Sequence, residues 1–300
     1  MAHQHDHGPA NFNRAFAVGV ALNSAFIVIE VIFGLLANSL ALISDAGHNL
    51  SDVLGLLLAW GATKLVQRRP SARRTYGLRR SSILVALVNA VVLLVAIGGI
   101  AWEAILRFGD PGHVAGRTVI WVAAVGIAIN GVTALLFLSG SKGDLNIRGA
   151  FLHMAADAGL SLGVVVAGIM ILATGWQWID PAASLVIAAV ILVGTWGLLR
   201  DSVNLALDAV PENIDMDAVA SYLGNLPAVT DMHDLHVWAM STTETALTAH
   251  LIVPDRSASD ALLALVYREL HERFEIEHAT LQIEEGDPAY PCGLASGETV

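Results

Sequence analysis

The chain has 300 residues and a mean hydropathy of +0.62, with 55% hydrophobic and only 14% charged residues. Ordinary soluble domains carry about 25% charged residues, so this composition excludes a purely soluble protein and indicates that most of the chain lies in a membrane. Residues 208–300 hold 3 Lys and Arg against 17 Asp and Glu, which argues against nucleic acid as a partner because nucleic acids attract basic surfaces.

The first 13 residues contain the stretch HQHDH and are predicted to form a flexible, His-rich N-terminal tail. Its histidines either collect metal weakly or belong to a solvated, disordered segment. The tail is too polar to be a cleavable signal peptide.

Six apolar runs follow, each close to the ~20 residues that an α-helix needs to cross a bilayer. They cover roughly residues 16–37, 40–66, 83–106, 119–138, 150–174 and 181–199. We therefore predict an α-helical membrane protein with a transmembrane domain of six helices over residues 14–207.

The connection between the second and third runs, residues 67–80, carries six arginines. Lys and Arg accumulate in cytoplasmic loops, so this connection is predicted to be cytoplasmic, and an even number of spans puts both termini on the same side. The compact loops and the lack of a eukaryotic sorting signal favour a bacterial inner membrane.

The charge balance changes where the last run ends, from 13 Lys and Arg against 10 Asp and Glu in residues 1–207 to the acidic balance of residues 208–300. Residues 208–287 are therefore predicted to form a cytoplasmic domain, followed by a flexible tail over residues 288–300. The domain reads helix, strand, strand, helix, strand, which fits an α+β sandwich with helices on one face of a sheet. The expected elements cover residues 215–226, 231–240, 245–253, 257–274 and 278–284.

Two of the predicted spans carry the same pair of ionisable residues. His48 and Asp52 are four residues apart, and so are His153 and Asp157, so that each pair lies on one face of its helix. A charged group at the bilayer centre costs roughly 2.5–3.5 kcal/mol, and a bound cation would compensate it. Two imidazoles and two carboxylates suit the tetrahedral nitrogen and oxygen coordination that zinc prefers. The alternative is that these are unrelated polar residues at helix contacts.

Four stretches resemble the cation diffusion facilitator family of zinc, cobalt and cadmium exporters. SLALISDAGHNLSD resembles the family signature, NIRGAFLHMAADAGLS its fifth span, and DLHVW and TLQIE its cytoplasmic domain, so that the resemblance covers residues 14–287. It implies a homodimeric metal/proton antiporter with a ferredoxin-like cytoplasmic domain. It also implies a transport site at His48, Asp52, His153 and Asp157, a set similar to that of the zinc-preferring branch.

Other polar residues have two interpretations each. Asp45 and Glu30 could both gate the site or relay protons. The alternative for Asp45 is a polar residue near a water-filled mouth, and the alternative for Glu30 is a pairing with a neighbouring helix. Arg79 or Arg80 is expected to pair with Asp208, a contact that the resemblance implies at the hinge of the dimer. The alternative is that these arginines contact lipid headgroups.

In the acidic domain the resemblance implies metal ligands at His233, His250 and Glu284, with His278 as the fourth candidate. Cys292, the single cysteine, either completes a site across the dimer or is a free thiol in the tail.

The expected function is export of a divalent cation, above all zinc, from the cytoplasm in exchange for protons. Zinc is also the ion expected in the cytoplasmic domain, and no organic cofactor is expected. The sequence has no H-E-x-x-H helix and no P-loop, so an enzyme is not expected, and four tight ligands argue against a channel. The alternative function is a membrane-anchored sensor whose acidic domain binds metal without transport.

Overall fold

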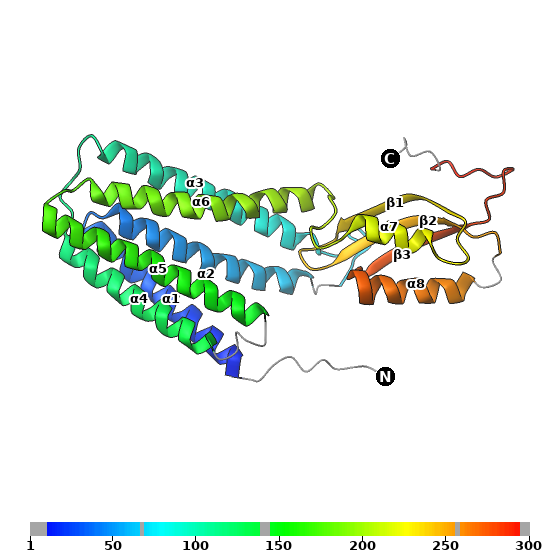
Figure 1. Cartoon of the computed structure of the whole chain (residues 1–300), viewed down its shortest axis with the longest axis horizontal. Coiled ribbons are helices and arrows are strands. Elements are labelled where there is room, and N and C mark those ends of the chain that lie inside the picture. Colours follow the sequence, from blue (N-terminus) through cyan, green and yellow to red (C-terminus); the bar gives the residue numbers. More distant parts are fainter. Residues whose placement is uncertain (1–10, 67–68, 139–144, 256–258, 295–300) are drawn as a thin grey trace. The chain divides into compact units, whose positions relative to one another are not determined.

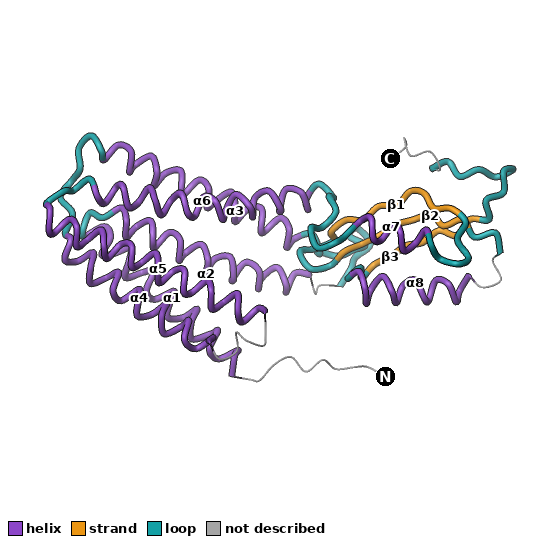
Figure 2. Tube along the Cα trace, in the orientation of Figure 1, coloured by secondary structure: helices purple, strands orange, loops and turns teal. Residues whose placement is uncertain are grey.

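The structure, a computed structural model, describes residues 11–66, 69–138, 145–255 and 259–294 (Figure 1). The chain divides into two compact units, Met1–Leu57 with Asn89–Gly197 and Leu58–Val88 with Leu198–Val300. Helices build the first unit, and the three strands all belong to the second (Figure 2).

Six long helices occupy the positions predicted for the spans. They are α1 (Asn11–Leu36), α2 (Leu40–Val66), α3 (Ser81–Arg107), α4 (Gly116–Leu138), α5 (Leu145–Thr174) and α6 (Ile179–Ala206). Within the described residues four stretches are long and apolar enough to cross a membrane: Ser81–Arg107, Gly116–Leu135, Phe151–Thr174 and Ile179–Ala206. Val20–Leu36 of α1 is a shorter apolar stretch. Four of the six predicted spans are thereby confirmed by length and composition.

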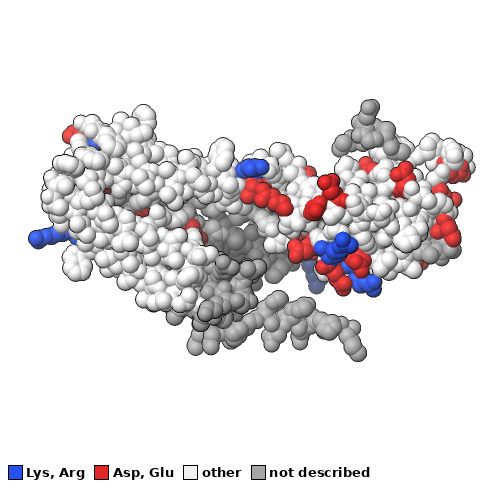
Figure 3. All heavy atoms as spheres, viewed as in Figure 1, with Lys and Arg blue, Asp and Glu red and all other residues white. Residues whose placement is uncertain are grey.

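The outer surfaces of these helices are apolar. Trp121, Val193 and Leu36 are each more than two-thirds exposed, and such contiguous apolar exposure is unusual for a protein surrounded by water. On the face drawn in Figure 3, charged side chains are sparse over the helices, whereas acidic side chains gather over the C-terminal domain.

Glycines allow the helices of the first unit to pack closely. A Cβ at Gly168 of α5 would lie 2.8 Å from Ile120 of α4, and a Cβ at Gly126 of α4 would lie 2.7 Å from the Phe26 ring of α1. Real Cβ atoms do not approach other atoms this closely, so only glycine fits at these positions. Small residues at helix contacts are the usual means of close packing in membranes.

The N-terminus of α2 is fixed by a side chain of α6. The buried Asp180 carboxylate accepts hydrogen bonds from the Ser39 hydroxyl and from the backbone N–H of Leu40, the latter at 2.7 Å. The first N–H groups of a helix have no partner within the helix, so this carboxylate caps α2. One turn later the Ser44 and Ser184 hydroxyls are hydrogen-bonded at 2.6 Å. Together these contacts set the position of α2, which carries half of the predicted transport site.

The second unit contains the predicted order of elements. They are α7 (Met216–Gly224), β1 (Asp231–Ala239), β2 (Thr245–Ile252), α8 (Ser259–Phe274) and β3 (His278–Glu284). The sheet order is β1-β2-β3, with β1 antiparallel and β3 parallel to β2. Leu247 and Leu251 of β2 pack in one core with Leu223 of α7 and Leu270 of α8. The helices therefore cover one face of the sheet, and the α+β prediction is confirmed.

Part of each predicted tail is described by the structure. Helix α1 begins at Asn11 and so includes the last three residues of the predicted 1–13 tail, whereas the HQHDH stretch lies outside the described residues. Of the predicted 288–300 tail, residues 288–294 are described.

Candidate functional site: two clusters of metal-binding side chains

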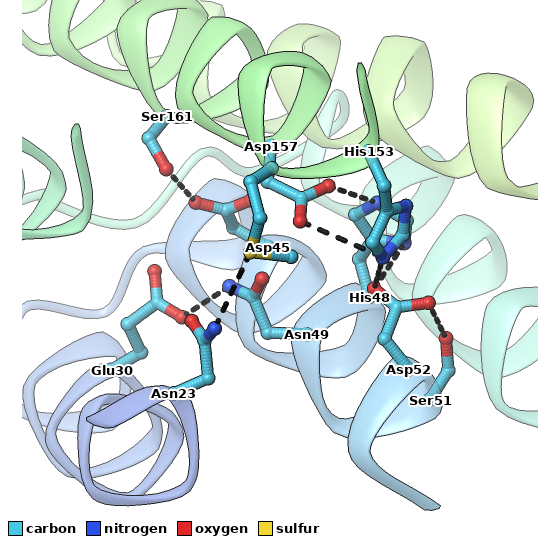
Figure 4. A network of polar contacts seen from close by, with 11 residues as sticks. Asn23, Glu30, Asp45, His48, Asn49, Ser51, Asp52, His153, Asp157 and Ser161 are labelled. Carbon is cyan, nitrogen blue, oxygen red and sulfur yellow. Dashed lines mark hydrogen bonds and ion pairs between the residues drawn. The ribbon is translucent and has the colours of Figure 1, made fainter. Parts of the chain in front are cut away.

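The four residues of the predicted transport site point toward one another between α2 and α5 (Figure 4). His48 Nε2 lies 3.2 Å from Asp157 Oδ1, and His48 Nδ1 lies 3.8 Å from Asp52 Oδ2. His153 Nε2 lies 3.4 Å from Asp52 Oδ2 and 3.7 Å from Asp157 Oδ2. Three of the four predicted residues, His48, Asp52 and Asp157, each offer one ligand atom within 4.8 Å of the others. His153 lies within ion-pair distance of both carboxylates but outside that group.

Single distances among these residues are close to those in a tetrahedral zinc site, but His48 approaches Asp52 and Asp157 through different ring nitrogens, only one of which can bind a given ion. Zinc binds nitrogen and oxygen at about 2.0–2.2 Å, so neighbouring ligand atoms are separated by roughly 3.3–3.6 Å. In addition, His48 Nδ1 and Asp52 Oδ2 are buried and accept or donate no hydrogen bond. Buried polar atoms without a partner are costly, and a cation between them would remove that cost.

The site is closed on one side and open on the other. The Asp157 side chain is 2% exposed, whereas that of His153 is 44% exposed. His48 and Asp52 lie between these extremes. In the single chain the edge of the site at His153 is thus the exposed one, and the edge at Asp157 is covered by protein.

A second polar cluster lies beside this site and links three helices (Figure 4). The Asn49 amide of α2 donates to Glu30 of α1 at 3.0 Å, and the Ser161 hydroxyl of α5 donates to Asp45 of α2 at 3.0 Å. Glu30 and Asp45 are fully buried. The structure thus shows Glu30 paired with a neighbouring helix, one of its two predicted interpretations, while a role in gating or proton relay stays a prediction.

Two arginines of the basic connection are paired. Arg80 forms an ion pair with Asp208, as predicted, and both side chains are half exposed. Arg79 instead pairs with Glu244 at 2.8 Å.

Three strands supply the cluster in the C-terminal domain. His233 of β1 and His250 of β2 are directly opposite in the antiparallel pair, with ring centroids 5.1 Å apart. Glu284 of β3 lies 2.9 Å from His250 Nδ1 and 3.6 Å from His233 Nε2. Side chains alternate between the two faces of a sheet. The neighbouring residue Leu251 points into the core, so His250 points to the opposite face.

The structure completes this cluster with Cys292 rather than with His278. The Cys292 sulfur lies 3.4 Å from His250 Nδ1, and one ligand atom from each of His233, His250, Glu284 and Cys292 falls within 4.8 Å of the others. His278 lies at the start of β3, is exposed, and packs edge-on against Tyr76. The sequence signal for Cys292 was only its chemistry, since nothing local places residue 292 near residue 250.

Asp234 is a neighbour of this cluster that sequence analysis missed. Its carboxylate lies 3.6 Å from His250 Nε2 and 3.0 Å from His236 Nε2. Asp234 has a φ of 54° at the point where the pairing of β1 with β2 becomes irregular. Such an irregularity re-aims side chains, and no sequence pattern predicts its position.

The cluster holds its carboxylate in the ionised form. Burial acts to raise the pKa of Glu284, but hydrogen bonds with Cys292 and Gln282 and the nearby His233 and His250 outweigh this effect and lower that pKa. An ionised carboxylate is the form that binds a metal ion.

Comparison with known proteins finds two family matches that together cover most of the chain. Residues 16–205 match the family model described as the cation efflux transmembrane domain, and residues 211–286 match the cytoplasmic domain of cation efflux proteins.

Three curated relatives are similar over nearly their whole length. The chain is 36% identical to a cadmium, cobalt and zinc/H(+)-K(+) antiporter of Bacillus velezensis, over 95% of this chain and 92% of the relative. It is 37% identical to the zinc transporter ZitB of Pectobacterium atrosepticum, over 95% and 89%. It is 36% identical to the metal cation efflux system protein CzcD of Cupriavidus metallidurans, over 94% and 89%.

A solved structure of the metal-bound C-terminal domain of a CzcD transporter is 30% identical over 24% of this chain and 99% of its own, with a TM-score of 0.22. That score does not establish a shared fold. The two family matches and the identity over nearly the full length of the relatives are decisive: the chain belongs to the cation efflux, or cation diffusion facilitator, family of membrane transporters.

Proposed function

We propose that this chain is a homodimeric exporter of divalent metal ions, with zinc as its main substrate, and that it exchanges the metal for protons. The observation that carries the proposal is the His48, Asp52, His153 and Asp157 cluster between two helices of a cation efflux protein. Relatives named as a zinc transporter and as a cadmium, cobalt and zinc/H(+)-K(+) antiporter support the choice of substrates. In this proposal α1 to α6 all cross a bacterial inner membrane, with both termini in the cytoplasm.

The ligands themselves provide the coupling to protons. Zinc requires neutral imidazole and ionised carboxylate, so binding of the metal displaces protons, and arrival of protons releases the metal. The open edge at His153 admits the ion and the sealed edge at Asp157 separates it from the other side. A bundle that rocks around a fixed site then exposes the ion alternately to the two sides of the membrane.

In the same proposal the cytoplasmic cluster holds a resident zinc ion through His233, His250 and Glu284. These residues fit such an ion, because His233 Nε2 is buried without a hydrogen-bond partner and points to the other two side chains. The ion would join three strands of the sheet and neutralise part of an acidic domain. The Arg80 to Asp208 ion pair acts as the hinge between the subunits, and the second family match, to a cytoplasmic domain of cation efflux proteins, supports an assembly of this kind.

A membrane-anchored sensor is the less favoured function. A sensor needs the acidic domain and an anchor, but it does not need matched His and Asp pairs facing one another inside the helical unit. These pairs cost free energy to bury, and transport gives a reason for them.

The proposal is tested by zinc uptake into proteoliposomes that contain the purified chain, with and without an imposed pH gradient. We expect saturable zinc flux that a gradient accelerates and that releases protons in the opposite direction. The Asp157→Ala variant should lose both fluxes, whereas Asp110→Asn, which changes an exposed carboxylate in the loop between α3 and α4, should keep both. If the zinc flux does not depend on the pH gradient, the proposed antiport is refuted. If Asp157→Ala transports zinc as fast as the wild type, the proposed transport site is refuted.

A further inference from the structure

The segment that follows β3 folds back over the sheet. Gly286 has a φ of +75°, and a Cβ there would lie 2.9 Å from Ile252 of β2. Glycine adopts this left-handed conformation without strain, and a side chain at residue 286 would in addition press on the Ile252 side chain of the neighbouring strand. A second turn follows, in which the Tyr290 N–H donates to the Asp287 carbonyl at 3.0 Å. The two turns reverse the chain and return Cys292 to the strands.

The returned Cys292 lies among three candidate metal ligands. Its sulfur is 3.4 Å from His250 Nδ1, which in turn is 2.9 Å from Glu284 Oε1, and that oxygen is 3.6 Å from His233 Nε2. A tetrahedral zinc ion with one sulfur and three nitrogen or oxygen ligands needs ligand separations of roughly 3.3–3.8 Å. The four donors are thus nearly preassembled around one point.

The strongest sign that this cluster binds a metal ion is on β1. His233 Nε2 is buried and has no hydrogen-bond partner, although it faces this cluster. This unpaired nitrogen, a carboxylate, a second imidazole and a thiol together make up four possible ligands. Four protein ligands are typical of a structural zinc site, which leaves no open position on the ion.

We propose that Cys292 is the fourth ligand of the cytoplasmic metal ion, supplied by the same chain that supplies His233, His250 and Glu284. The proposal rests on the proposed cytoplasmic metal site and adds a sulfur ligand that changes its character. On binding, the Cys292 thiol gives up its proton to water and the thiolate binds the metal.

Two properties of the site follow from the sulfur. Thiolate is a soft ligand that favours zinc, cadmium and cobalt over magnesium and calcium. The ion also fastens residues 286–294 to the sheet, because Cys292 is eight residues beyond the last residue of β3. The conformation of this C-terminal segment therefore reports whether the cytoplasmic site is loaded.

The single cysteine makes the proposal directly testable in the full-length protein. Titration of the purified, metal-free chain with Co²⁺ should produce a sulfur-to-cobalt charge-transfer band that saturates at one ion per chain. The band should persist in Asp157→Ala, which removes a transport ligand, and should vanish in Cys292→Ser. As a matched control, Glu272→Gln on the exposed face of α8 should keep the band, whereas Glu284→Gln should weaken it.

A second measurement follows alkylation of Cys292 by mass spectrometry. Zinc should slow alkylation at least about tenfold, since a metal-bound thiolate is a poor nucleophile, and this protection should disappear in the His233→Ala variant but not in His271→Ala. If Asp157→Ala still binds one Co²⁺ but its spectrum is unchanged by Cys292→Ser and zinc gives no protection, the inference is overturned while the transport function stands. If the band and protection are present but the liposomes show no zinc flux, the inference holds and the proposed function fails.

Discussion

The four proposed ligands of the transport site differ in burial, and this difference predicts a graded response to mutation. Asp157→Asn retains the size of the side chain and one oxygen but removes the negative charge. The carboxylate of Asp157 contacts both imidazoles, at 3.2 Å to His48 and 3.7 Å to His153. Because its side chain is almost fully buried, water does not replace it. His153, on the open edge, is replaced by water more easily.

The expected loss of zinc affinity can be scaled from what is typical of metal sites in proteins. Loss of a group that merely orients a ligand typically costs 10–100-fold in metal affinity. Loss of a buried ligand should therefore lower zinc affinity at least about 100-fold, which corresponds to about 2.7 kcal/mol. For His153→Ala we expect only about a tenfold loss, because a water molecule takes the vacated position.

The assay is the initial rate of zinc uptake into proteoliposomes as a function of zinc concentration. It compares wild type, Asp157→Asn, His153→Ala and the exposed-loop control Asp110→Asn, each checked for a monodisperse elution profile. The apparent KM for zinc should rise in the order Asp110→Asn, His153→Ala, Asp157→Asn. A larger effect for His153→Ala than for Asp157→Asn would refute the link between burial and ligand strength.

Three further predictions concern stability, each measured by thermal unfolding in detergent. Gly126→Ala should destabilise the helical unit by about 1–3 kcal/mol, because the added methyl group would overpack against the Phe26 ring of α1. At the control Gly131→Ala the added Cβ meets open space, so that variant should be neutral or slightly stabilising. Equal unfolding temperatures for the two variants would contradict this. Asp180→Asn should cost about 1–3 kcal/mol because an NH2 group replaces one of the two oxygens that accept from the buried N–H groups at the start of α2, and an unchanged melting temperature would exclude the cap. A double-mutant cycle of Arg80→Ala and Asp208→Ala should give a coupling below about 1 kcal/mol, since the pair is half exposed; a larger value would indicate that the pair is buried in the assembly.

The proposed transport site could be predicted from the sequence because the information that points to it is local. A spacing of four residues places His48 beside Asp52, and His153 beside Asp157, on any α-helix. Burial of such groups in apolar helices requires compensation, so two matched pairs predict a shared ion. The α+β order of the C-terminal domain was also readable, and β3 (His278–Glu284) has the predicted bounds, because alternation with period 2 identifies a strand without tertiary contacts.

Only the tertiary structure shows which side chains lie together in the second cluster. His278 shares a strand with Glu284, yet it contacts Tyr76, while Cys292 reaches His250 through the reversal at Gly286. Such a meeting depends on strand register and on a left-handed backbone conformation, which are set by contacts between residues far apart in the chain. The same applies to the hydrogen bonds of Asp180 with the start of α2, more than a hundred residues earlier. Helical and strand periods are properties of short segments, whereas the closing of a site across strands or helices is a property of the packed chain.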